Sequence, residues 1–246
     1  AGAQGTHFEP RAKRVIHLFM NGGPFQADLF DPKPSLLKYA GQKPEGANLL
    51  TERPTGGLLP SPFRFRPHGA NGVPVSELLP KLSQHIDDIC VLRSMHADNP
   101  NHGPALLQIN NGTISPTAPS MGSWLSYGLG TENRNLPSFM VISPGLPYAG
   151  GQVWGSDFLP VLHQGTRIIP GKEPIANMSR RSFYRQQQET ELDLLSFFNR
   201  QHLKGREQDL NLAGRIKSFE TAFGMQMAAP EASCMVISPL DQAERF

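Results

Sequence analysis

The predicted fold depends on Val15 to Pro34, which read V-I-H-L-F-M-N-G-G-P-F-Q-A-D-L-F-D-P-K-P. An apolar run stopped by turn residues is typical of a strand buried on both faces, so we predict a strand over Arg14 to Met20. In open α/β sheets, ligands bind in the crevice beyond the carboxyl ends of the strands. Asn21, Asp28 and Asp31 follow this strand and are therefore candidates for a metal or anion site. A tight turn followed by a solvated acidic loop is the alternative interpretation.

Further strands and helices are predicted to alternate along the chain. Strands are expected at Ile86 to Ser94 and at Phe139 to Ile142. Helical spacing of apolar residues predicts helices over Val75 to His85, His102 to Asn110, Ser120 to Leu129, and Ser182 to about Met227, the last with interruptions at Gly205 and Gly214. The apolar stripes of the last segment are expected to face the core. This alternation predicts the α/β class, with a mostly parallel sheet flanked by helices.

Composition excludes some classes of function. The 246 residues include 23 Lys and Arg against 21 Asp and Glu, so we expect no nucleic-acid partner. The 24 glycines and 23 prolines indicate many turns and long irregular connections, such as the segment from Asp31 to Pro74. Cys90 lies in an apolar run and is predicted to be buried, while a disulfide to Cys234 stays open. No apolar stretch is long enough to span a bilayer, and no signal peptide is visible.

Three further segments join the opening stretch in a family resemblance. They read H-G-P-A-L-L-Q-I-N-N-G (His102 to Gly112), P-S-M-G-S-W-L-S-Y-G-L-G-T-E-N (Pro119 to Asn133) and M-Q-M-A-A-P-E-A (Met225 to Ala232). In this order the four segments resemble the start of a sulfatase-like bacterial family of the alkaline-phosphatase superfamily, the domain-of-unknown-function family numbered 1501. The resemblance implies an alkaline-phosphatase-like domain whose N-terminal part covers residues 14–232. Residues 1–13 would then be an unstructured segment and residues 233–246 a divergent tail.

The resemblance also implies a nucleophile at a helix start. Thr117-Ala118-Pro119-Ser120-Met121 is similar to the sulfatase pattern C-x-P-S-R, with Thr117 at the nucleophile position and Ser120 at the serine. No cysteine is present there to become formylglycine, and Met121 replaces the arginine. A helix N-terminus favours a tetrahedral oxyanion through its unpaired N–H groups. If this site is catalytic, Thr117 is favoured as the nucleophile, because Ser120 is also suited to cap the helix. A structural position in the loop is the alternative for Thr117.

The implied cofactor is a divalent metal: zinc, calcium, magnesium or manganese. Asn21 occupies the place where the superfamily usually has an aspartate, and Asp28 and Asp31 are the carboxylates that would compensate for it. After the second predicted strand the spacing H-x-D-x-x-x-H places His96, Asp98 and His102. These side chains would converge on a metal or on a leaving-group oxygen, with His96 as a ligand and His102 as a catalytic group. A hydrogen-bonded structural role is the alternative for each histidine.

Related proteins carry further ligands in segments resembling W-D-x-H, E-F-G-R-T-P and G-R-D-H, and this sequence contains none of them. The resemblance therefore implies the N-terminal portion of a domain that is incomplete at its C-terminus. The first interpretation is a metal-dependent hydrolase acting on sulfate or phosphate esters of a small molecule or polysaccharide. The second is a non-catalytic secreted module for binding or structure. Because the family commonly carries an export signal, we expect a periplasmic or secreted location.

Overall fold

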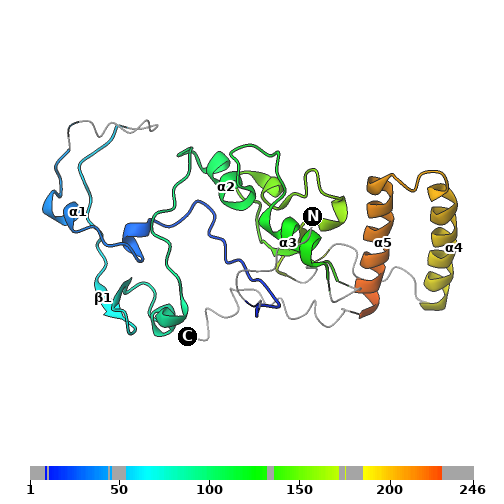
Figure 1. Cartoon of the computed structure of the whole chain (residues 1–246), viewed down its shortest axis with the longest axis horizontal. Helices are drawn as coiled ribbons and strands as arrows, with labels where there is room; N and C mark the ends of the chain where they lie inside the picture. Colours follow the sequence, from blue (N-terminus) through cyan, green and yellow to red (C-terminus); the bar gives the residue numbers. More distant parts are fainter. Residues whose placement is uncertain are drawn as a thin grey trace. The chain divides into compact units, whose positions relative to one another are not determined.

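The computed structural model describes residues 9, 11–43, 45, 54–131, 136–171, 175 and 185–228. The chain divides into two compact units, Ala1–His96 and Ala97–Phe246. Helices and short strands occur in both units, which confirms the α/β class (Figure 1). The tail at 233–246, Cys234 and most of the segment at 1–13 lie outside the described residues. The alkaline-phosphatase-like arrangement and the single domain over 14–232 stay predictions.

The first unit is built from short elements joined by long loops. In chain order they are the 3-10 helix η1 (Gln26–Asp28), α1 (Pro34–Lys38), β1 (Phe65–His68), β2 (Val73–Ser76) and the 3-10 helix η2 (Leu82–Asp88). β1 and β2 form an antiparallel hairpin, in which Phe65 pairs with Ser76 and His68 with Val73. The small core contains Ala27, Val75 and Ile86, each at most 3% exposed.

The second unit contains most of the helix. Its elements are α2 (His102–Asn111), α3 (Met121–Leu129), β3 (Met140–Ile142), the 3-10 helices η3 (Gly150–Trp154) and η4 (Val161–His163), β4 (Thr166–Ile168), α4 (Arg185–Leu203) and α5 (Leu210–Ala228). α2 and α3 both pack against η3, and α3 also packs against η4. The predicted helices at His102 and Ser120 are confirmed. Of the predicted strand Phe139 to Ile142, Met140–Ile142 form β3, which pairs in parallel with β4. It is not the buried strand that was expected, since Met140 and Ile142 are 45% and 66% exposed.

α4 and α5 form a helical hairpin, which confirms the predicted helical segment and its break at Gly205 (Figure 1). Gly214 does not interrupt α5. A Cβ at Gly214 would lie 2.8 Å from Cγ1 of Val161, so this glycine instead allows α5 to approach η4 closely. The expectation that the apolar stripes face the core is wrong for several residues. Leu195, Phe198 and Phe219 are 45%, 58% and 56% exposed. Helical spacing places apolar residues on one face of a helix, but it does not determine whether another element packs against that face.

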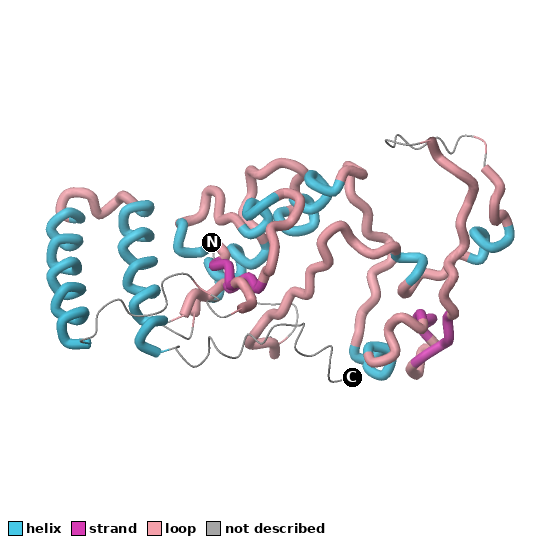
Figure 2. The backbone as a smooth tube through the Cα atoms, turned by 180° about the vertical axis from the view of Figure 1, so that it is seen from behind, coloured by secondary structure: helices cyan, strands magenta, loops and turns pink. Residues whose placement is uncertain are grey.

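Two of the three predicted buried strands do not form. Residues 14–20 are irregular, and Ile16 and Leu18 are each 85% exposed. Residues 86–94 contain the end of η2 and then irregular backbone. A strand must pair its N–H and C=O groups with a neighbour, and neither segment has a strand beside it among the described residues. The remaining strands form two separate pairs, one antiparallel and one parallel, instead of the predicted mostly parallel sheet (Figure 2).

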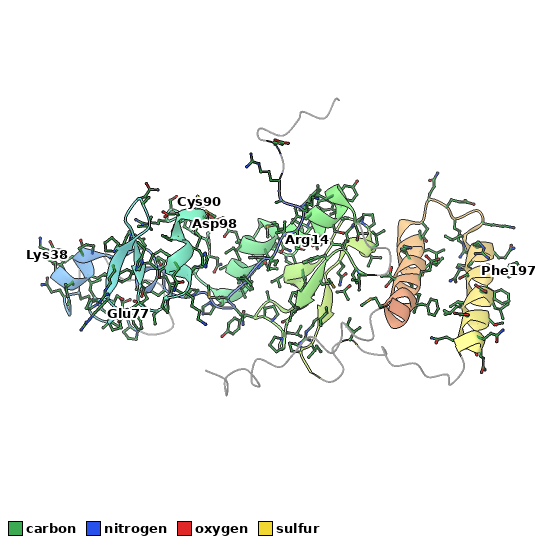
Figure 3. The ribbon with its side chains drawn as sticks, turned by 90° about the horizontal axis from the view of Figure 1, so that it is seen from below. Arg14, Lys38, Glu77, Cys90, Asp98 and Phe197 are labelled. Atoms are coloured by element: carbon green, nitrogen blue, oxygen red, sulfur yellow. The ribbon has the colours of Figure 1, made fainter. Side chains whose placement is uncertain are left out.

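Two smaller predictions are also corrected. The helix expected over Val75 to His85 is replaced by the end of β2 and the start of η2. Pro80 lies in the interior of that segment, where it lacks the N–H that a continuous α-helix needs. Cys90 is exposed (Figure 3), because the apolar run around it is not a strand in a core. None of the helices formed by the described residues combines the length and apolar character needed to cross a bilayer.

Candidate functional site

The carboxylates after the first apolar run have different environments. Asp28 ends η1, and its Oδ1 is buried without a hydrogen-bond partner in the described part of the chain. Asp31 is 14% exposed and its Oδ2 lies 2.6 Å from Nζ of Lys33. Asp31 is therefore already neutralised by a cation of the chain, whereas Asp28 retains an oxygen that a bound cation would satisfy.

The other predicted metal ligands of the first unit are exposed. Asn21 lies in the turn that follows residues 11–20, and His96 lies in irregular backbone at the end of the unit. Searched over the described residues, the chain contains no group of three or more His, Cys, Asp or Glu side chains that could hold a metal ion. The expected ligand set Asn21, Asp28, Asp31 and His96 is thus not assembled there. Only Asp28 fits such a role, so no chemical step through a metal is derived from this arrangement.

The polar residues at the start of the second unit are engaged with local partners. Asp98 (Figure 3) accepts a hydrogen bond from Nε2 of Gln108 at 2.7 Å, and its backbone N–H donates to Oε1 of the same side chain at 2.8 Å. His102 is the first residue of α2, which Asn101 caps by accepting from the N–H of Gly103. The His102 ring stacks on Tyr148, with centroids 5.1 Å apart and an interplanar angle of 15°. This histidine is exposed and positioned by a neighbouring ring.

The approach to α3 separates its two candidate hydroxyls. Thr117 is exposed, and its N–H donates to the carbonyl of Ser115 at 2.8 Å. Ser120 is 2% exposed and caps α3, accepting at 3.4 Å from the N–H of Ser123. The hydroxyl of Ser123 in turn donates to the carbonyl of Gly155 at 2.9 Å. Solvent therefore reaches Thr117 but hardly reaches Ser120.

The structure does not bring His102 to this approach. Asn111, the last residue of α2, donates from Nδ2 to the carbonyl of Ala118 at 3.0 Å, so the approach lies at the C-terminal end of α2. His102 begins the same helix, about 14 Å away along its axis at 1.5 Å per residue. A proton donor for a group bound near Thr117 must therefore be another residue or water.

A serine–histidine cluster was missed by the sequence reasoning. The hydroxyl of Ser126 lies 2.8 Å from Nδ1 of His163 and is also hydrogen-bonded to the hydroxyl of Ser138. Burial lowers the pKa of His163, and its ring meets the ring of Tyr127 edge to face, with centroids 5.3 Å apart. Ser126 is 4% exposed, so the cluster joins α3 to η4 through a hydroxyl that solvent hardly reaches.

Part of this cluster carried a signal in the sequence. Ser120, Ser123 and Ser126 recur every three residues, which places hydroxyls along one side of a helix. Their low exposure shows that this side faces the interior of the unit. No comparable spacing marks His163, which lies in a loop-rich region far along the chain.

The elements and hydroxyls described above define an α/β protein whose candidate chemistry lies where loops meet the ends of α2 and α3. The chain belongs to the family described as protein of unknown function DUF1501, whose model matches residues 12–239. No curated protein and no solved structure matches the chain.

Proposed function

We propose that this chain carries part of a metal-dependent hydrolase of sulfate or phosphate esters, of the sulfatase-like kind found in the alkaline-phosphatase superfamily. The observation that supports this proposal most is the exposed hydroxyl of Thr117, three residues before the capped N-terminus of α3. The substrate would be an ester of a small molecule or polysaccharide, and the protein would work in the periplasm or outside the cell.

The start of α3 has hydrogen-bond donors for an anionic group. The N–H groups of Ser123 and Trp124 are bound by Ser120, whereas those of Met121 and Gly122 have no partner among the described residues. Free N–H groups at a helix N-terminus attract sulfate or phosphate oxygens. In this proposal Thr117 Oγ1 attacks the sulfur or phosphorus atom and gives its proton, through water, to the ester oxygen, whose bond breaks as the alcohol leaves. A water molecule then hydrolyses the threonine ester, which releases sulfate or phosphate and restores the hydroxyl.

The metal of this proposal would supply charge neutralisation and activation of a hydroxyl. In the first unit, Asp28 has a buried Oδ1 without a hydrogen-bond partner among the described residues, which fits a cation; Thr117 belongs to the second unit, so this oxygen is not assigned to the same site. Zinc, calcium, magnesium and manganese are all compatible with a carboxylate oxygen.

Hydrolysis of 4-nitrophenyl sulfate and 4-nitrophenyl phosphate tests the role of Thr117. We expect Thr117→Ala to lower the rate by about three orders of magnitude, because the nucleophile is lost. Thr190→Ala is the matched control, since Thr190 is exposed on α4 and its hydroxyl donates to the carbonyl of Gln186. Equal rates for the Thr117→Ala variant and the wild type would contradict the assignment of Thr117.

A non-catalytic module for binding or structure is the second candidate. Met121, the first residue of α3, is 44% exposed at the position where the sulfatase pattern has an arginine, so no cation holds an anion there. Under this candidate, neither ester is hydrolysed above background with any of the four metals. The same assay therefore distinguishes the two candidates.

A further inference from the structure

The second unit contains a cavity that adjoins the start of α3 through Gly155, whose carbonyl accepts hydrogen bonds from Ser120 and Ser123. Its volume is about 430 Å³, within the range of roughly 300–1,000 Å³ that small-molecule sites occupy. The wall comes from η3, the loop after it and η4, with side chains from Gln152, Ser156, Asp157, Leu159, Val161 and Gln164. Gly151 and Gly155 complete it, so backbone is accessible on one side.

Three polar side chains of the cavity have unused hydrogen-bonding capacity. Those of Gln152, Asp157 and Gln164 make no hydrogen bond or ion pair with any other described residue. Together they offer two amide groups, which donate and accept, and one carboxylate, which accepts twice. Asp157 is also the one non-glycine residue with a positive φ, 43°, in the described part of the chain. Departures of this kind concentrate at ligand-binding positions.

The charge of the wall restricts the ligand. None of the lining residues is basic, and Asp157 is the single acidic one. A sulfate, phosphate or carboxylate would face this carboxylate without a cation to balance it. One carboxylate is also too few for a metal ion, which takes several oxygen ligands. A neutral ligand with many hydroxyl groups matches the wall best, because each hydroxyl both donates and accepts.

Aromatic rings lie next to the same loop. Phe158 stands between the lining residues Asp157 and Leu159 and is 67% exposed. Its ring meets Trp124 edge to face, with centroids 5.7 Å apart, and Trp124 is 47% exposed. Rings with exposed area offer apolar contact to the C–H face of a sugar ring, while the amides and the carboxylate bind its hydroxyls.

We infer that the cavity between η3 and η4 binds a neutral carbohydrate through Gln152, Asp157 and Gln164. The inference does not rest on the proposed hydrolase, because it needs neither a metal nor an ester. The site belongs to the second unit alone.

Intrinsic fluorescence is a suitable measurement, because the chain has two tryptophans and both lie near this loop. Trp124 contacts Phe158, and Trp154 ends η3. The full chain is titrated in EDTA with maltotetraose, cellotetraose and mannotetraose, each to about 20 mM, with sodium sulfate and choline as charged probes. We expect saturable binding of at least one sugar, with a dissociation constant near or below about 1 mM.

Variants then locate the binding. Asp157→Asn retains a residue that tolerates the left-handed backbone and removes the charge, and we expect it to weaken sugar binding at least tenfold. We expect the second variant, Gln164→Ala, to weaken sugar binding at least tenfold as well. Glu220→Gln is the matched control, because Glu220 is an exposed carboxylate on α5 bound to Lys217, and its sugar affinity should equal that of the wild type.

Three outcomes would overturn the inference. They are no saturable binding of any of the three sugars, equal weakening by Glu220→Gln, and binding of sulfate or choline in place of sugar. Because the titration contains no metal and no ester, failure of this inference leaves the hydrolase proposal standing. Failure of ester hydrolysis likewise leaves the sugar titration unaffected.

Discussion

Ser120 is buried at the start of α3, with its hydroxyl 2.9 Å from that of Ser123. We expect Ser120→Ala to lower the free energy of unfolding by about 1–2 kcal/mol, because it removes a helix cap and leaves a buried hydroxyl with one partner fewer. Urea denaturation measures this loss. Ser218→Ala on the exposed side of α5 is the control and should change stability little. An equal effect of the two substitutions would contradict the capping role.

His163 is a second single residue with a predicted effect: it makes the free energy of unfolding depend on pH. Burial lowers its pKa in the folded state, so the unfolded chain, with an ordinary pKa near 6.5, binds the proton more readily. Stability is therefore complete above about pH 6.5 and falls as the pH drops toward the lowered pKa. In denaturation curves between pH 8 and pH 5, His163→Gln should lose part of this slope. His17→Gln, an exposed control, should keep it. A slope unchanged in His163→Gln would refute the account.

For helices and strands, sequence features that act within one element predicted the structure, whereas features that depend on contact with another element did not. Apolar spacing predicted α2, and the cap at Ser120 with the apolar spacing after it predicted α3, because a helix closes its hydrogen bonds within itself. The strand predicted over Arg14 to Met20 does not form. A strand needs hydrogen bonds to a neighbouring strand, and the sequence of the run itself does not show whether that neighbour exists. Burial of a side chain also depends on contact with another element: Phe197 on α4 (Figure 3) is apolar, yet it is 48% exposed.

For the candidate site, the sequence predicted that Ser120 caps the helix, which is confirmed. It could not predict that His102 lies at the far end of α2 from Thr117, since that follows from the contact between Asn111 and Ala118. It also missed the link between Ser126 and His163, because residues far apart in the chain meet there through folding. Side chains brought together by tertiary contacts have no fixed spacing in sequence.

Two glycines in or between helices give opposite predictions. Gly205 has a φ of 75° in the turn between α4 and α5, whereas Gly128 lies inside α3, and a Cβ at either would meet nothing within 4 Å. Gly205→Ala should therefore destabilise by about 1–2 kcal/mol through backbone strain alone. Gly128→Ala should stabilise by about 0.5–1 kcal/mol, because alanine loses less entropy in a helix. Thermal denaturation compares them, and shifts of the same sign would contradict this reasoning.

At the scale of the whole molecule, the chain divides after His96. Arg93 is exposed in irregular backbone just before this division, whereas Arg167 in β4 donates from Nε to the carbonyl of Ser143 at 3.1 Å. Brief trypsin digestion should therefore cut after Arg93 well before it cuts after Arg167. Mass spectrometry identifies the fragments, and Arg93→Gln should abolish the early cut. Cleavage after Arg167 first would argue against the two compact units.

We propose that the chain takes part in metal-dependent hydrolysis of sulfate or phosphate esters. The most direct measurement is product release from 4-nitrophenyl sulfate and 4-nitrophenyl phosphate by the chain supplied in turn with Zn²⁺, Ca²⁺, Mg²⁺ and Mn²⁺. We expect product release with at least one metal. This release should stop when EDTA is added and return when the same metal is added back in excess. No release above background with any metal, or release that EDTA leaves unchanged, would contradict the proposal.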